Sequence, residues 1–165
     1  MNTLRMLKHL LLPDWWRRRV FSAADLVTIG QAIAASEKRH RGELRFVVES
    51  GLSPAALWRG TSTRQRAAEV FAVERVWDTE ENSGILIYVQ LADRRVEILA
   101  DRGIATRVPQ AEWDAICRGM EQAFRAGQWR QGALAAVAHA GELLAENVPA
   151  GANNPNHLPD APRVF

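Results

Sequence analysis

Oxygen-bearing side chains lie in two loops that the sequence predicts to be neighbours in space. Glu81 and Asn82 precede an apolar run at residues 85–91, and Asp101 follows a second run at residues 95–100. Carboxylate and amide oxygens are the ligands that calcium and magnesium prefer in proteins. We therefore predict a divalent-cation site formed by Glu81, Asn82 and Asp101, with calcium or magnesium as the ion.

The predicted site depends on a hairpin that joins the two runs. Residues 92–94 are too few for a crossover, so the strand at residues 95–100 must return antiparallel to the strand at residues 85–91. The end of one strand then lies beside the start of the other, which brings the two loops together. Asp78 and Glu80 lie close to the same edge in sequence. The alternative interpretation is that these loop acids are solvated and hold no ligand.

Other elements must build the sheet on which this edge depends. Ser22 begins a capping-box pattern and predicts a helix, and the alternation at residues 44–49 predicts a strand. Thr63 is predicted to cap a second helix, which carries Trp77 on its apolar side. A strand, a crossover helix and another strand imply a parallel pair, so the sheet is predicted to be mixed, with residues 85–91 as its central strand.

The rest of the chain completes a single α/β domain. Residues 109–127 show the clearest amphipathic helix, and an alanine-rich helix follows at about 128–146. The predicted fold has helices packed on a small mixed β-sheet in a three-layer, sandwich-like arrangement. We divide the chain into an N-terminal amphipathic segment at 1–20, the α/β domain at 21–147, and a Pro- and Asn-rich tail at 148–165, which is expected to be an extended arm or disordered.

Composition restricts the class of protein. The chain has 165 residues and a formal net charge of only +2, which argues against nucleic-acid binding because that needs a concentrated basic face. The single cysteine, Cys117, cannot form an internal disulfide and is expected in the core. No run approaches the roughly 20 apolar residues of a membrane-spanning helix. We expect the N-terminus to be retained and the protein to be cytoplasmic.

The N-terminal segment leaves two interpretations open. Leu4, Leu7, Leu10 and Leu11 fall on one side of a short helix, and residues 15–19 are two tryptophans followed by three arginines. The segment could be a lid that packs on the domain. It could also be an anchor at a membrane surface, because an apolar face beside basic residues and tryptophan is typical of interfacial helices.

The residues of the hairpin resemble those of a known family. Residues 82–88 read Asn-Ser-Gly-Ile-Leu-Ile-Tyr, and they are followed by Asp-Arg at 93–94, Val-Glu-Ile at 96–98 and Asp-Arg-Gly-Ile at 101–104. This order and spacing resemble the TPM-domain family. Residues 36–46 also resemble the junction between helix and first strand in its short, soluble bacterial members. The resemblance covers about residues 20–145.

The resemblance implies a fold and a set of functions. It implies an α/β sandwich, and a role in membrane-protein or photosystem maintenance, with acid-phosphatase-like activity and divalent-metal binding in some members. This chain departs from the family pattern at two points. Asn82 stands where many members have an aspartate, and residues 101–105 lack the glutamate of the family's Gly-Tyr-Gly-Leu-Glu run while gaining Asp101. Metal binding should consequently be weaker than in the family, or the site should be rearranged around Asp101.

Three functional hypotheses follow. The preferred one is an accessory or interaction domain that recognises an unknown protein partner at the sheet edge beside the Asn82 and Asp101 loops and binds a cation weakly. The second is a divalent-metal-dependent phosphatase, in which Arg94, Arg102 or Arg107 would neutralise the phosphate and for which no separate nucleophile is evident. The third is a module anchored to a membrane surface or a partner through residues 1–20.

Overall fold

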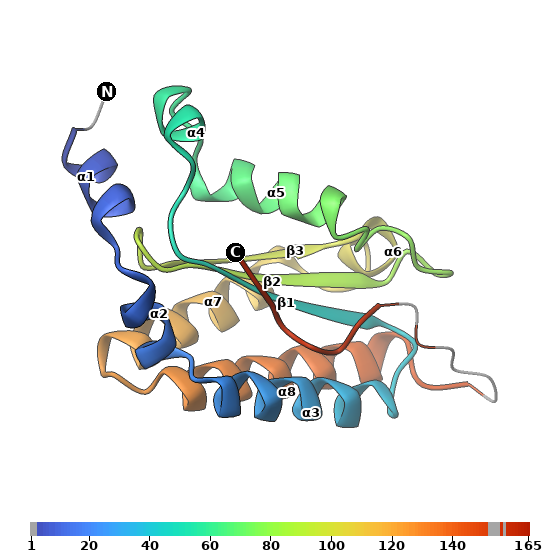
Figure 1. Cartoon of the computed structure of the whole chain (residues 1–165). Coiled ribbons are helices and arrows are strands. Elements are labelled where there is room, and N and C mark those ends of the chain that lie inside the picture. Colours follow the sequence, from blue (N-terminus) through green and yellow to red (C-terminus); the bar gives the residue numbers. More distant parts are fainter. Residues whose placement is uncertain (1–2, 152–155, 157) are drawn as a thin grey trace.

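The computed structural model describes residues 3–151, 156 and 158–165, and that part of the chain contains eight helices and four strands (Figure 1). The helices are α1 (Thr3–Leu11), α2 (Asp14–Val20), α3 (Ala23–Glu37), α4 (Pro54–Trp58), α5 (Thr63–Val73), α6 (Arg102–Ala105), α7 (Gln110–Arg125) and α8 (Trp129–Asn147). The strands are β1 (Glu43–Glu49), β2 (Gly84–Gln90), β3 (Arg95–Ala100) and β4 (Arg163–Val164).

The strands form one mixed sheet in the order β3-β2-β1-β4. β1 and β2 run parallel with Glu43 opposite Gly84, whereas β2 and β3 run antiparallel with Ile85 opposite Ala100. The predicted parallel pair and the predicted hairpin are both confirmed. The end of β3 therefore lies beside the start of β2, which is the edge at which the cation ligands were predicted.

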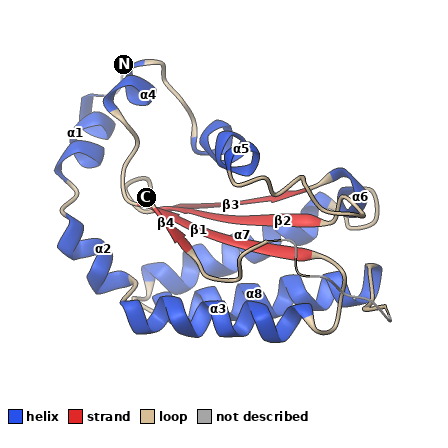
Figure 2. Cartoon of the chain, turned by 45° about the vertical axis from the view of Figure 1, so that its right-hand side comes forward, coloured by secondary structure: helices blue, strands red, loops and turns tan. Residues whose placement is uncertain are grey.

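Helices cover both faces of the sheet (Figures 1 and 2). α5 lies on one face, and α3, α7 and α8 lie on the other. The larger core cluster includes Leu44, Phe46 and Ile87 under α3, α7 and α8, while Val47 and Tyr88 belong to the cluster under α5. The three-layer α/β arrangement predicted from the sequence is confirmed. No helix in the described ranges has the length and apolar character needed to cross a membrane.

Strand β1 is buried on both faces, so its alternating sequence does not reflect a solvated face. All seven residues are buried, including Arg45 and Glu49. Glu49 accepts a hydrogen bond from Tyr88 Oη and forms an ion pair with Arg66 of α5, with 2.9 Å between Oε1 and Nη2. Burial, together with the Glu49 carboxylate, raises the pKa of Tyr88 well above its ordinary value. The face toward α5 thus contains internally paired charges.

The helix boundaries agree closely with the capping signals in the sequence. Ser22 Oγ accepts a hydrogen bond from Asp25 N, and the capping box predicted for α3 is confirmed. The cap of α5 is Ser62 and not Thr63, because Ser62 Oγ accepts from Gln65 N while the Gln65 side chain accepts from Ser62 N. The reciprocal pair satisfies two backbone donors, which a cap at Thr63 would not do.

Trp77, which was predicted to lie on the apolar side of a helix, is found at the surface. Trp77 is 50% exposed, because α5 ends at Val73 and the chain turns at Arg75, whose φ is 54°. The helical spacing that placed Trp77 on the apolar side therefore does not extend to it. Trp113, in contrast, is buried, and Trp129 stacks on Phe124 with 4.5 Å between ring centroids.

The described part of the tail is an extended arm, whereas residues 152–155 and 157 of the predicted tail lie outside the described residues. β4 pairs parallel with β1, and Phe165 N donates to Val48 O at 2.9 Å. Leu158 is buried in the cluster under α5. Arg45 Nη1 donates to the backbone oxygens of Pro159 and Ala161 at 2.8 and 2.7 Å. The arm therefore covers the β1 edge of the sheet.

Candidate functional site

Hydrogen bonds to the backbone and side chain of Thr79 fix the loop at residues 78–83. Asn82 N donates to Thr79 O at 3.1 Å, and Ser83 N donates to Thr79 Oγ1 at 2.9 Å. Both Thr79 and Ser83 are buried, and Asn82 adopts a left-handed conformation with a φ of 52°. Asparagine tolerates this conformation better than most residues, which accounts for its place at the tip of the turn.

The loop packs against neighbouring backbone so closely that only glycine fits at two positions. A Cβ atom at Gly84 would lie 1.9 Å from Val76 O, and a Cβ atom at Gly103 would lie 2.1 Å from Glu81 O. Gly103 N also donates to Asn82 O at 2.9 Å. The two loops predicted to be neighbours are therefore in direct backbone contact.

The structure brings Asn82 and Asp101 together through an arginine. Arg102 Nε donates to Asn82 Oδ1 at 3.2 Å, and Arg102 N donates to Asp101 Oδ1 at 2.7 Å. Asp101 Oδ2 is buried, and no hydrogen-bond donor in the described ranges reaches it. An oxygen of this kind lacks compensation for its loss of water, so the Asp101 carboxylate has unused capacity to bind a cation.

Glu81, the third predicted ligand, has a different partner. It forms an ion pair with Arg41, whose Nε also donates to Pro149 O at 3.0 Å. Sequence reasoning missed Arg41. The signal was present, since parallel β1 and β2 begin at Glu43 and Gly84, and the residues just before them must then be neighbours. We call Arg41, Glu81, Asn82, Asp101 and Arg102 the loop edge.

The donor set of the loop edge fits a cation only weakly. Calcium takes about six to eight oxygens and magnesium six, whereas Asn82 and Asp101 supply two side-chain ligands between them, with Glu81 a third if it leaves Arg41. No group of three or more His, Cys, Asp or Glu residues suited to a metal is present in the described residues. A bound ion would therefore depend on backbone oxygens and water for much of its coordination.

The three arginines predicted to contact an anion occupy different places. Arg102 belongs to the loop edge, and Arg107 is exposed and donates to Asn147 O at the end of α8, at 2.6 Å. Arg94 lies in the turn between β2 and β3, at the opposite end of the hairpin. The fold thus does not gather all three around one position.

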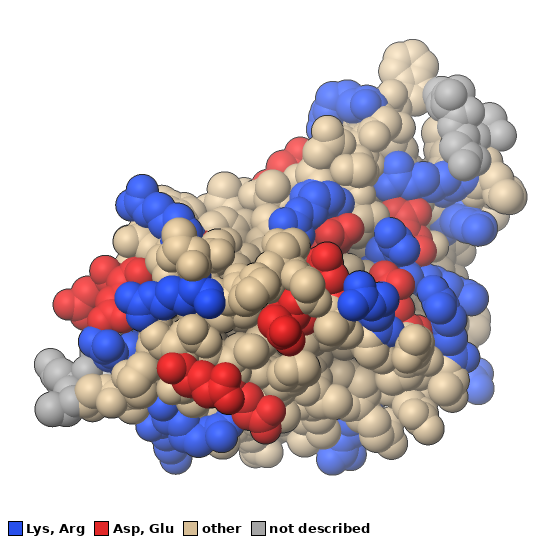
Figure 3. All heavy atoms as spheres, turned by 180° about the vertical axis from the view of Figure 1, so that it is seen from behind, with Lys and Arg blue, Asp and Glu red and all other residues tan. Residues whose placement is uncertain are grey.

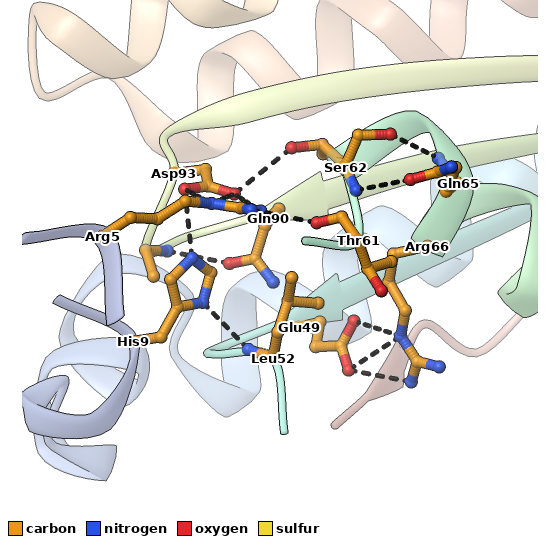
Figure 4. Close-up of polar contacts among 12 residues, drawn as sticks. Arg5, His9, Glu49, Leu52, Thr61, Ser62, Gln65, Arg66, Gln90 and Asp93 are labelled. Carbon is orange, nitrogen blue, oxygen red and sulfur yellow. Dashed lines mark hydrogen bonds and ion pairs between the residues drawn. The ribbon is translucent and has the colours of Figure 1, made fainter. Parts of the chain in front are cut away.

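A second polar cluster attaches α1 to that opposite end of the hairpin (Figure 4). Arg5 donates to Asp93 through Nε and Nη2, at 3.0 and 2.8 Å, and through Nη1 to Thr61 O at 3.0 Å. His9 is buried and accepts from Leu52 N at Nδ1, so its Nε2 donates to Asp93 Oδ1 at 3.0 Å. Partial burial acts to raise the pKa of Asp93. The hydrogen bonds from the His9 imidazole and the Arg5 guanidinium outweigh this effect and hold the pKa of Asp93 well below its usual range.

A cavity of about 340 Å³ lies where α3 meets β1, and its lining includes the ionisable side chains of Glu37, His40, Glu43 and Asp160. Burial raises the pKa of Glu37 to about 9, and the neighbouring Glu43 and Asp160 act in the same direction, although Leu44 N donates to Glu37. Burial lowers the pKa of His40 to about 4. His40 bonds to Ser36 Oγ and Gly42 O at 2.9 and 2.8 Å.

Because Glu37 lines this cavity with a raised pKa, we predict that the free energy of unfolding falls in mild alkali. The pKa of Glu37 is higher in the folded chain than in the unfolded chain, so its contribution to stability is complete below about pH 4.5 and declines as the pH rises toward 9. Wild-type protein should lose about 2 kcal/mol of unfolding free energy between pH 7 and pH 9. Urea unfolding at both pH values measures this loss. Glu37→Gln should remove most of it, and the exposed control Glu112→Gln should leave it unchanged; equal losses in wild type and Glu37→Gln would contradict the assignment.

The comparisons with known proteins agree with this fold. The sequence profile of the family described as the TPM domain matches residues 17–143. The NMR structure of the BA42 protein from the psychrophilic bacterium Bizionia argentinensis is similar, with 27% identity over 88% of this chain and 95% of that one and a TM-score of 0.77. The N-terminal domain of a protein from P. gingivalis shares the fold at 20% identity over 84% of this chain and 83% of its own, with a TM-score of 0.56. No curated protein matches the sequence.

Proposed function

Because the chain belongs to the TPM-domain family, we propose that it is an interaction domain whose loop edge recognises a protein partner and binds a divalent cation weakly. The observation that carries this proposal is the pairing of two arginines with two of the three predicted ligands. Arg102 bonds to Asn82 Oδ1, and Arg41 pairs with Glu81. The Arg41 guanidinium neutralises Glu81, and the Arg102 guanidinium occupies the Asn82 oxygen that a cation would otherwise bind.

The internal arginines explain why binding of a divalent ion should be weak. A cation that approaches Asn82 must compete with Arg102, and it also meets the positive charge of that arginine. Asp101 nevertheless keeps Oδ2 without a hydrogen-bond donor. The loop edge therefore has one free anionic oxygen and one amide oxygen that an ion could take from an arginine.

The same surface has features that suit a protein partner. Trp77 is half-exposed directly before the loop, and Asp78 and Glu80 are exposed within it. Exposed tryptophan beside charged side chains is typical of binding hot spots. Since Thr79 and Asn82 hold the loop in one conformation, little conformational entropy would be lost on binding.

Isothermal titration of calcium, and then magnesium, into metal-stripped protein tests the cation part of the proposal. Wild type should bind calcium with a dissociation constant of about 10⁻³ M, as weak sites do. Arg102→Gln should bind about fivefold more tightly, because it removes a competing positive charge. Asp101→Ala should lose binding, and the exposed control Glu112→Ala should retain it.

The pattern across the variants decides the outcome. Equal affinity in wild type, Asp101→Ala and Arg102→Gln would place any bound ion elsewhere and contradict the proposal. A metal-dependent phosphatase at this edge requires the same ion, so the absence of all binding would remove that hypothesis as well. Recognition of a partner would then have to be independent of a cation.

A further inference from the structure

Helix α1 is attached to the domain through one face only. Arg5 and His9, four residues apart, both bond to Asp93 in the turn between β2 and β3. Met6 packs on the same side against the small cluster that contains Leu52 and the residues of α4. The contacts fix the orientation of the helix, and the opposite face is left without a protein partner in the described residues.

That opposite face is apolar and exposed. Leu4, Leu7 and Leu11 recur at helical spacing and are 62%, 53% and 67% exposed, and Trp15 of α2 is 61% exposed. Leu10 is exposed as well. These five residues, all between positions 4 and 15, are half of the ten large apolar side chains that are exposed in the described part of the chain. A concentration of this kind marks an interaction surface, because isolated apolar residues are otherwise scattered.

The apolar face borders a groove with basic residues at its margin. The groove has a volume of about 610 Å³, and its lining includes Leu7, Leu11 and Trp15 together with Lys8 and Arg94. Arg18 and Arg19 of α2, close to Trp15 in the sequence, are also exposed, although they do not line the groove. Figure 3 shows neutral and basic side chains next to one another on the lobe at its upper right, where α1 and α4 lie.

We propose that the outer face of α1, with Trp15, docks on the surface of an anionic lipid bilayer. Leucines along one helical face, a tryptophan at its end and basic residues at its margin form the pattern of a helix that lies in the membrane interface. Residues 3–20 contain Lys8 and the three arginines at 17–19 beside a single acid, Asp14, which favours a negatively charged surface over a neutral one.

The contacts of Arg5 and His9 would hold the domain at a fixed angle to that bilayer. Because both residues bond to Asp93, the turn between β2 and β3 lies next to α1, at the same end of the domain. The loop edge lies at the other end of β2, beside Gly84. Docking through α1 therefore leaves the loop edge free, and the two proposals can fail independently.

Co-sedimentation of the full chain with lipid vesicles tests this inference. Vesicles of phosphatidylcholine with about one-third phosphatidylglycerol should bind wild type, and pure phosphatidylcholine should bind it far less. Leu4→Gln/Leu7→Gln/Leu11→Gln should lower the partition coefficient by more than about tenfold, since glutamine keeps helix propensity but removes the apolar face. The matched control Val27→Gln/Val73→Gln changes residues that are 60% and 72% exposed elsewhere, and it should bind as wild type does.

Charge is tested separately. Arg18→Gln/Arg19→Gln should weaken binding to the anionic vesicles by about fivefold for each arginine and should leave the thermal unfolding midpoint unchanged. Binding that survives the leucine substitutions, or that is absent from anionic vesicles, would overturn the inference. Light scattering that shows a dimer dissociated by those substitutions, with no vesicle binding, would identify the face as a self-association surface and would equally overturn it.

Discussion

Arg45→Met is expected to lower the free energy of unfolding by about 4 kcal/mol. Arg45 is only 5% exposed, and its guanidinium donates to Glu74 Oε2 from Nε and Nη2, at 2.9 and 2.6 Å. Nη1 donates to Pro159 O and Ala161 O of the C-terminal arm. Methionine fills much of the same volume but leaves a largely buried carboxylate and two carbonyl oxygens without this donor, and that loss is costly in a buried pair.

Urea unfolding of wild type and Arg45→Met measures this effect, and limited proteolysis should show earlier cleavage near the C-terminus in the variant. Arg130→Met is the control, because Arg130 is half-exposed and its distance to Asp25 is 3.9 Å. The control should change stability by less than about 1 kcal/mol, as exposed ion pairs do. Similar losses in the two variants would show that Arg45 does not hold the arm as described.

Gly84→Ala is expected to cost about 3 kcal/mol of unfolding free energy, close to the upper end for overpacking. The Cβ atom would lie 1.9 Å from Val76 O and 2.9 Å from Val76 C. Both are backbone atoms, so no side-chain rotation can relieve the contact. Gly84 also begins β2 and accepts a hydrogen bond from Asp101 N at 2.8 Å, so the strain would reach the loop edge.

Gly119→Ala is the matched control for this substitution. Gly119 lies within α7, and a Cβ atom there would meet nothing within 4 Å. Alanine in a helix interior is more favourable than glycine, so this variant should be more stable than wild type by up to about 1 kcal/mol. Thermal unfolding of both variants gives the comparison, and equal midpoints would contradict the close approach of Gly84 to residue 76.

The hairpin could be predicted because each signal in it is local. Residues 92–94 are too short for a crossover, and that fact alone sets β3 antiparallel to β2 and brings Asp101 to the loop that contains Asn82. The mixed sheet and the helical layers followed from similar reasoning. The cap of α5 was placed one residue late, because Ser62 and Thr63 can both cap and only the reciprocal bond with Gln65 distinguishes them.

The partners of the charged residues could not be predicted, because they depend on contacts between distant segments. Arg5 and His9 meet Asp93 across more than eighty residues of sequence. Arg45 belongs to the alternating segment that predicts a strand, and nothing local indicates that the C-terminal arm returns to cover it. The sequence could therefore predict that Asn82 and Asp101 lie close together, and it indicated Arg102 as a possible anion contact, but it gave no indication that Arg41 pairs with Glu81.

A calcium titration followed by ¹H–¹⁵N correlation NMR of the full chain would show directly whether the loop edge binds the ion. The amide signals of Asn82, Gly84 and Gly103 should shift progressively with calcium, whereas those of Asp93 and Arg94 at the far end of the hairpin should not. Asp101→Ala should abolish the shifts, and Arg102→Gln should produce them at lower calcium concentration. Shifts confined to other regions, or shifts at the loop edge that persist in Asp101→Ala, would contradict the assignment of the loop edge as the cation site.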